Sequence, residues 1–122
     1  MAYVLVVEDE PDHRDILREI LRWAGHDVRT ARDVLAARAA IARQHPDLVI
    51  LDLHLAEGGS GFALLAELRA APGRRQIPII ACTGEPEALD QAREDGRFSA
   101  VFTKPFAIAS LLDAVNTLTG TD

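Results

Sequence analysis

The sequence contains a single cysteine, and this scarcity excludes two classes of small protein. With only Cys82 in 122 residues, neither an internal disulfide framework nor a cysteine-based zinc site can form. Cys82 lies in the apolar run 77–82, where a lone thiol is typical of a small core residue rather than of a reactive site. We therefore expect Cys82 to lie in the core.

The sequence also lacks a long hydrophobic run, a targeting segment and a block of basic residues. No apolar stretch approaches the roughly 20 residues that span a bilayer, and the first residues lack the basic and apolar segments of a signal peptide. We expect a cytoplasmic protein without membrane contact. The formal net charge is −6 and the 13 basic residues are scattered. This disfavours direct binding to nucleic acid and favours cations or basic partner surfaces.

Short aliphatic runs alternate five times with helical patterns. The expected strands and helices are, in order, 3–7, 12–24, 27–30, 31–44, 48–52, 61–71, 77–82, 86–95, 100–102 and 107–118. Such alternation predicts an α/β fold with a doubly wound parallel sheet of five strands and right-handed crossovers. Because no repeat or interior linker interrupts the pattern, we expect residues 1–122 to form one domain.

The most informative strand is 48–52, in which four aliphatic residues end in Asp52. An aliphatic run of this kind suits a central strand that is buried on both faces. A carboxylate at its carboxyl end lies at the rim, in the crevice where open α/β sheets bind ligands. Glu8 and Asp9 follow the first strand, so three carboxylates are expected to converge at this edge.

Three carboxylates in one crevice repel each other, by roughly 4 kcal/mol per pair at about 4 Å and an effective dielectric constant near 20. Protonation or a bound cation relieves this repulsion, and ligand sets of oxygen alone select a hard ion such as Mg²⁺. Thr83, the backbone N–H of Gly84 and Lys104, which close the last two strands, then remain to contact an anion. The combination describes a phosphoryl site with Asp52 as nucleophile.

Four segments of the sequence resemble the response-regulator receiver domain of two-component signalling, and the resemblance covers essentially the whole chain. The segments are 6–10 (Val-Val-Glu-Asp-Glu), 51–53 (Leu-Asp-Leu), 81–84 (Ala-Cys-Thr-Gly) and 104–106 (Lys-Pro-Phe). Separations of 43, 31 and 21 residues between Asp9, Asp52, Thr83 and Lys104 are close to those of the family. The resemblance implies a flavodoxin-like (βα)5 fold with strand order 2-1-3-4-5.

The resemblance also implies how the site works. Asp52 would accept a phosphoryl group from a histidine kinase or a histidine phosphotransfer domain. Mg²⁺ would be bound directly by Asp9, Asp52 and the backbone carbonyl of His54, with Glu8 acting through water. The phosphoryl oxygens would be held by Thr83 and Lys104, and the bond between Lys104 and Pro105 would be a cis peptide.

The sequence departs from the family pattern in the loop after Asp52 and at the switch. Gly61 stands one residue later than the family's glycine, so this loop is one residue longer. The aromatic switch residue usually lies three residues before the lysine, where this chain has Val101. Phe102 is adjacent but should point to the opposite face of the strand. The usual coupling of Thr83 to an inward-turning aromatic ring is therefore not expected to apply unchanged.

Six further side chains are polar or aromatic and are considered as candidate functional residues. His54 and Glu85 flank the site and are candidates for tuning the lifetime of the phosphoryl group. His13, His26 and His45 have no metal-ligand spacing and are expected to be solvated helix or turn residues. Trp23 is expected to contribute to helix packing, with a partner-docking surface as the alternative.

The leading hypothesis is a phosphorylation-controlled switch of protein–protein contacts, acting through an unknown output protein. It would be a monomer or a weak phosphorylation-dependent dimer and no enzyme beyond its own phosphorylation and dephosphorylation at Asp52. Alternatives are a receiver domain from a hybrid histidine kinase or larger regulator, a degenerate docking receiver and a flavodoxin relative, although no glycine-rich phosphate loop follows the first strand. A phosphatase of the haloacid dehalogenase kind would need a second aspartate where His54 stands, and a cap domain.

Overall fold

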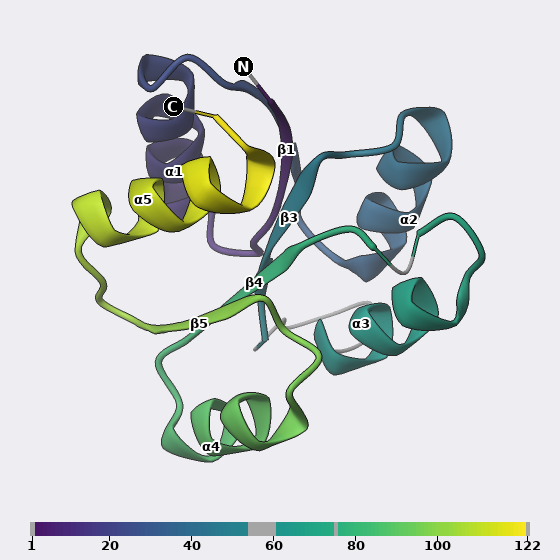
Figure 1. The fold of residues 1–122 in the computed structure, drawn as a ribbon. Helices are drawn as coiled ribbons and strands as arrows, with labels where there is room; N and C mark the ends of the chain where they lie inside the picture. The colour runs from purple at the N-terminus through teal and green to yellow at the C-terminus, as the bar shows by residue number, and fades with distance from the viewer. Residues whose placement is uncertain (1, 54–60, 75, 122) are drawn as a thin grey trace.

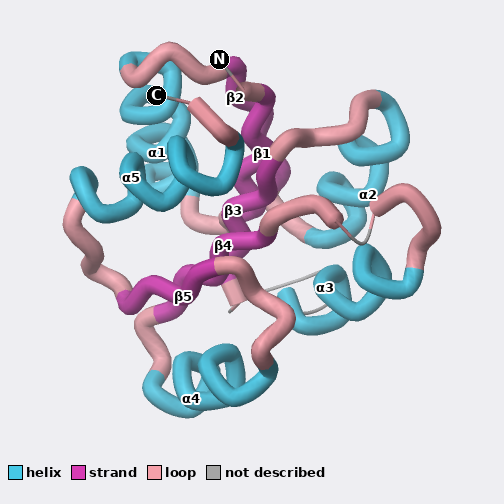
Figure 2. Tube along the Cα trace, viewed as in Figure 1, coloured by secondary structure: helices cyan, strands magenta, loops and turns pink. Residues whose placement is uncertain are grey.

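The computed structural model describes residues 2–53, 61–74 and 76–121. In this part of the chain five strands alternate with five helices (Figures 1 and 2). The elements are β1 (Tyr3–Val7), α1 (Pro11–Trp23), β2 (Asp27–Ala31), α2 (Val34–Arg43), β3 (Leu48–Asp52), α3 (Gly61–Ala70), β4 (Ile79–Thr83), α4 (Pro86–Asp95), β5 (Ala100–Thr103) and α5 (Ile108–Thr119).

The strands form one parallel sheet in the order β2-β1-β3-β4-β5, which confirms the predicted flavodoxin-like topology. The register aligns the carboxyl ends: Val7 lies beside Leu51, and Asp52 lies beside Cys82. Thr83, the last residue of β4, lies beside Thr103. The polar residues that end or follow β1, β3, β4 and β5 therefore share one edge of the sheet.

Helices cover both faces of the sheet, because its strands are apolar on both sides. Alternate residues of β1 point to opposite faces of the sheet and so belong to two different hydrophobic clusters. Val4 and Val6 pack with α1 and α5, whereas Leu5 and Val7 pack with α2 and α3. All of β1, β3 and β4 is buried, and a fully buried aliphatic side chain contributes about 1.5–3 kcal/mol. This burial fixes the strands whose ends carry the site.

Most element boundaries lie within one residue of the sequence expectation, but two elements begin two or more residues later than expected. Helix α2 begins at Val34 rather than at residue 31. Ala31 still belongs to β2, and the Asp33 carboxylate caps the helix by accepting a hydrogen bond from the backbone N–H of Ala36 at 2.8 Å. Strand β4 begins at Ile79 rather than at residue 77, and a proline directly before it has no N–H to donate to a ladder.

Some side chains lie elsewhere than expected. His26 is buried rather than solvated: its Nδ1 accepts from the backbone N–H of Ala2 at 3.3 Å and its Nε2 lies 2.9 Å from Oδ1 of Asn116. Trp23 does not pack, since 84% of it is exposed. Ile16 on α1 and Ile108 on α5 are 53% and 51% exposed, although both are large apolar residues. Trp23, Ile16 and Ile108 therefore leave apolar side chains exposed on the surface.

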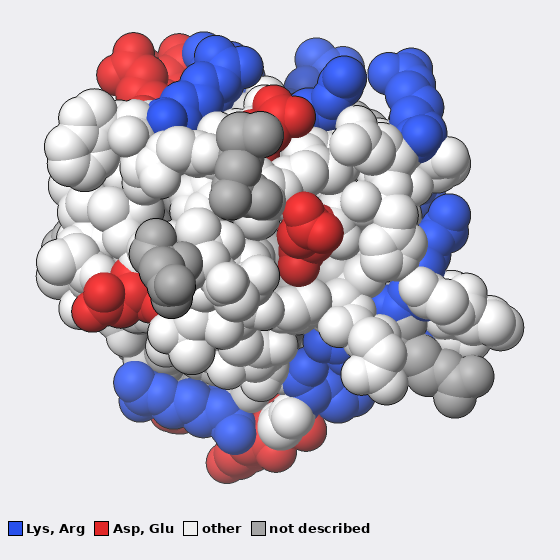
Figure 3. Space-filling view, turned by 45° about the horizontal axis from the view of Figure 1, so that its top comes forward, with Lys and Arg blue, Asp and Glu red and all other residues white. Residues whose placement is uncertain are grey.

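Charged side chains are distributed around the molecule. On the face shown in Figure 3, basic side chains are spread around the rim, mostly along its upper and right-hand edges, and form no continuous stripe. Among the described residues, the helices are all too short or too polar to traverse a bilayer.

The start of α3 packs directly against the strand that carries Asp52. A Cβ atom on Gly61 would lie 2.9 Å from the Asp52 carbonyl oxygen and 3.0 Å from the Cα of Leu53. Since backbone atoms at these distances cannot yield as a flexible side chain would, only glycine fits here. Gly61 therefore sets how closely α3 approaches the end of β3.

We predict that Gly61→Ala destabilises the protein by about 1–3 kcal/mol, because overpacking against backbone outweighs the helix propensity of alanine. Chemical denaturation measures the free energy of unfolding. The matched control is Gly84→Ala, whose Cβ would meet only Lys104 atoms at 3.8 Å or more, an ordinary contact. Equal effects of the two substitutions would contradict the prediction.

Cys82 is 2% exposed, as expected of a core residue, and burial raises the pKa of its thiol to about 12. Thiolate is the reactive form, so we predict that Ellman's reagent at pH 8 labels the native protein at least about a hundredfold more slowly than the denaturant-unfolded chain. Comparable labelling rates in the two states would contradict this.

Candidate functional site

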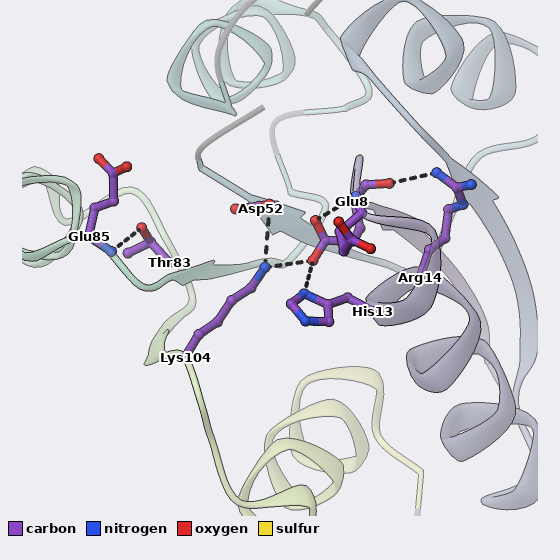
Figure 4. Close-up of polar contacts among 8 residues, drawn as sticks. Glu8, His13, Arg14, Asp52, Thr83, Glu85 and Lys104 are labelled. Carbon is purple, nitrogen blue, oxygen red and sulfur yellow. Dashed lines mark hydrogen bonds and ion pairs between the residues drawn. The ribbon is translucent and has the colours of Figure 1, made fainter. Parts of the chain in front are cut away.

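The carboxylates of Glu8, Asp9 and Asp52 gather at the carboxyl edge of the sheet, and Figure 4 shows Glu8 and Asp52 there, both facing Lys104. Each offers one oxygen, and these oxygens lie within 4.8 Å of one another. Glu8 and Asp52 are 2% and 6% exposed, so water screens them poorly. Glu8 directly follows β1 and Asp52 ends β3, which are neighbouring strands. The predicted convergence of the three carboxylates is therefore present.

Lys104, which directly follows β5, places a positive charge between the carboxylates of Glu8 and Asp52. Its Nζ lies 2.6 Å from Oε1 of Glu8 and 3.4 Å from Oδ2 of Asp52. Its backbone N–H donates to the carbonyl of Thr83 at 2.9 Å, which ties the lysine to the end of β4. The peptide bond from Lys104 to Pro105 is cis.

The ionisation of this group follows from its crowding. Burial raises the pKa of Glu8, and the neighbouring Asp52 raises it further, while Lys104 opposes both. Burial by itself would lower the pKa of Lys104, but the hydrogen bond to Glu8 and the charge of Asp52 raise it above its ordinary value. The lysine is thus firmly cationic, and one ammonium group faces more than one carboxylate.

The donor set fits a hard divalent cation. Three carboxylates within reach of one point offer only oxygen ligands, which Mg²⁺ prefers to nitrogen or sulfur. One ammonium group, that of Lys104, contacts Glu8 and Asp52, and three carboxylates share the cluster. The cluster could therefore hold a metal ion. The backbone carbonyl of His54, a further expected ligand, lies outside the described residues.

Thr83 lies at the end of β4, with its side chain fully buried. Its Oγ1 accepts a hydrogen bond from the backbone N–H of Glu85 at 3.1 Å, which closes the turn into α4. In Figure 4 the Glu85 carboxylate points away from Asp52 and Glu8. Gly84 passes beside Lys104, since a Cβ there would lie 3.8 Å from the lysine Cβ. The backbone at 83–85 therefore borders the site.

The two candidate switch residues of β5 face opposite sides of the sheet. Val101 packs against the core under α2, α3 and α4, whereas Phe102 packs against the core under α1 and α5. Phe102 contacts Phe106 with ring centroids 6.0 Å apart. Phe102 thus points to the opposite face of the sheet from Val101, as expected, and its ring packs in the layer of α1 and α5.

The sequence interpretation missed two neighbours of Glu8 on α1. His13 Nδ1 lies 3.5 Å from Oε1 of Glu8, and the Arg14 guanidinium donates to the Glu8 backbone carbonyl at 3.1 Å. His13 was expected to be solvated, and its side chain is indeed 54% exposed, yet it borders the acidic group. The available signal was Pro11, which starts α1 so soon after β1 that its first turn returns over the strand end.

An apolar groove runs beside the site, with a volume of about 490 Å³. Glu8, His13 and Lys104 line its end at the site. The rest of its lining is apolar and comes from α1, the β5–α5 connection and the start of α5: Ile16, Leu17, Ile20, Pro105, Phe106 and Ile108. The exposed Ile16 and Ile108 therefore belong to a single surface next to the carboxylates.

Comparison with known proteins gives the same family over nearly the whole chain. The family model described as "Response regulator receiver domain" matches residues 4–116. The transcriptional regulator RpaA of Synechocystis is 30% identical over 97% of this chain, which spans only 49% of that protein. A putative response regulator from Chloroflexus aurantiacus shares the fold with a TM-score of 0.88, at 28% identity, and the match covers 98% of both chains.

A further solved structure is the receiver domain of a signal transduction histidine kinase from Syntrophus aciditrophicus. It has a TM-score of 0.88 and 30% identity, and the match covers 98% of this chain and 91% of the other. The sheet order agrees with these matches, and the chain belongs to the family of response-regulator receiver domains of two-component signalling.

Proposed function

We propose that Asp52 accepts a phosphoryl group from a phosphohistidine of a histidine kinase or phosphotransfer domain. An Asp52 carboxylate oxygen attacks phosphorus, the P–N bond breaks, and its electrons return to the departing imidazole. The observation that carries the proposal is a buried strand-end carboxylate with an ammonium group 3.4 Å away and two further carboxylates beside it. An acceptor needs compensation of this kind, because transfer adds negative charge to an already acidic pocket.

Each neighbour has a role in this proposal. Asp9 and Asp52 would bind Mg²⁺, with Glu8 acting through water, and the ion would neutralise the phosphoryl oxygens. Lys104, held cationic by Glu8 and Asp52, pairs with a phosphoryl oxygen. The Thr83 hydroxyl and the backbone N–H of Gly84 donate to the other oxygens. His54 and Glu85 tune the lifetime of the acyl phosphate.

The output would be a change of protein–protein contacts near Thr83 and β5, without an enzymatic product. Because Val101 replaces the family's aromatic residue and Phe102 packs in the other core, the response would rest on Thr83 and the 83–85 turn. Residues 1–122 would be one domain, cytoplasmic and monomeric or weakly dimeric on phosphorylation, either alone or within a longer regulator, with no direct contact to nucleic acid or membrane.

The apolar groove beside the site would receive the phosphodonor protein. A phosphohistidine can approach Asp52 only if its protein covers the rim, and the groove at Ile16 and Ile108 is the apolar part of that rim. A helix that carries the histidine could lay its apolar residues along this groove.

Phosphorylation is tested with acetyl phosphate and Mg²⁺, followed by intact mass spectrometry. We expect a gain of one phosphoryl group, about 80 Da, in the wild type and none in Asp52→Asn or without Mg²⁺. Lys104→Met should lower the labelled fraction, because a compensating charge is lost. Labelling that persists in Asp52→Asn would contradict the assignment of the acceptor, and the absence of labelling despite Mg²⁺ binding would contradict acceptance from small donors.

The groove is tested by transfer from any histidine kinase or phosphotransfer domain that phosphorylates the wild-type chain. Ile16→Glu and Ile108→Glu should slow this transfer about tenfold or more, because each places a charge in the apolar contact. Labelling by acetyl phosphate should stay unchanged. The matched control is Leu35→Glu on α2, which is 67% exposed and outside the groove. If the control slowed transfer equally, the donor would dock elsewhere.

A further inference from the structure

A second cavity, of about 660 Å³, lies away from the carboxylates, at the β2 edge of the sheet between α1 and α2. Its volume is in the range of small-molecule sites. Four arginines line it: Arg18 and Arg22 from α1, Arg29 from β2, and Arg43 from α2. In a chain with a net charge of −6, such a concentration of basic residues around one hollow is unexpected.

Most of these guanidinium groups have donors to spare. Arg18 donates to Asp15 at 2.9 Å. Arg22, Arg29 and Arg43 have no side-chain hydrogen bond or ion pair within the described part of the chain. Each guanidinium has five N–H donors in a planar fork that matches phosphate oxygens. Three such groups around one hollow can bind an anion from different sides.

Helix-end electrostatics do not explain the whole group. Arg22 and Arg43 lie in the last turns of α1 and α2, where a positive charge offsets the negative end of the helix dipole. That role accounts for two of the four. Arg29 lies on the edge strand and also lines the cavity, where no helix end requires it.

A buried polar group on β1, the strand next to β2, has no hydrogen-bond partner among the described residues. Tyr3 is 6% exposed, and its hydroxyl has no hydrogen bond among the described residues. Its strand neighbour Asp27 lines the cavity. Burial raises the pKa of Tyr3 and Arg29 opposes the shift, so the hydroxyl lies within the electrostatic reach of the cavity wall.

The remaining lining argues for a small ligand. Ala36, Ala39 and Ala40 of α2 add a wall of small apolar side chains. Val28 is only 3% exposed, so an added peptide strand could not reach its outward backbone groups. Edge-to-edge pairing with a second copy would bring the arginines of both copies together. We propose that this cavity binds a small molecule bearing phosphate, with the phosphate on Arg22, Arg29 and Arg43 and its organic part against the alanines.

The test is titration of the ¹⁵N-labelled chain, without Mg²⁺, with inorganic pyrophosphate and separately with AMP. We expect saturable shifts of amides in β2 and the facing parts of α1 and α2. Tighter binding of AMP would support both the phosphate site and the placement of an organic part against the alanines, whereas equal or tighter binding of pyrophosphate would support the arginine site and overturn that placement. Shifts centred on Lys104 and Asp52, or no saturation with either probe, would overturn the proposal.

Variants then test the arginines. Arg22→Gln and Arg29→Gln should each weaken binding about tenfold, since a charge-assisted hydrogen bond is lost. Both side chains are exposed, Arg22 on helix α1, where glutamine is tolerated, and Arg29 on the edge strand β2, so the fold should persist, which circular dichroism checks. The matched control is Arg32→Gln, whose side chain is 80% exposed and does not line the cavity. An equal loss in Arg32→Gln would show nonspecific charge attraction and overturn the site.

Discussion

Repulsion among carboxylates at one edge of the sheet is the constraint on which the rest of the structure depends. Glu8 and Asp52 are almost wholly buried, and a buried charge is tolerated only with a partner. Lys104 is that partner for both, although it comes from the opposite half of the chain. The pocket can therefore form, although one ammonium group faces three carboxylates. The negative charge that remains uncompensated favours the binding of a cation.

The surrounding backbone prevents the carboxylates from moving apart. If α3 could move away from β3, Asp52 could turn toward solvent and the repulsion would be relieved without a ligand. Close contact of Gly61 with the Asp52 carbonyl opposes such a movement, as does the burial of β3 on both faces. On the other side, the hydrogen bond from Lys104 to the Thr83 carbonyl ties the lysine to β4. Charge and packing thus fix the same few atoms.

The site residues that end or follow a strand could be predicted from the sequence. Aliphatic runs that stop at Glu8, Asp52 and Thr83 are local signals, and the parallel topology then brings these residues to one edge. What escaped prediction depends on long-range packing. His26 is buried because Ala2 and Asn116, far away in sequence, supply its hydrogen bonds. Trp23 has a large apolar side chain of the kind usually found in a core, but it lies on the outer side of α1, where no described residue covers it.

The same reasoning explains why the arginines at β2 were invisible in the sequence. Arg18, Arg22, Arg29 and Arg43 are spread over 26 positions and three elements, so no basic run marks them, and only the packing of α1 and α2 around the edge strand gathers them. Their charge is placed away from the acidic edge, which avoids competition with Lys104 for Glu8 and Asp52. A chain this small can therefore carry two regions of opposite sign, one that attracts cations and one that attracts anions, because the sheet keeps them apart.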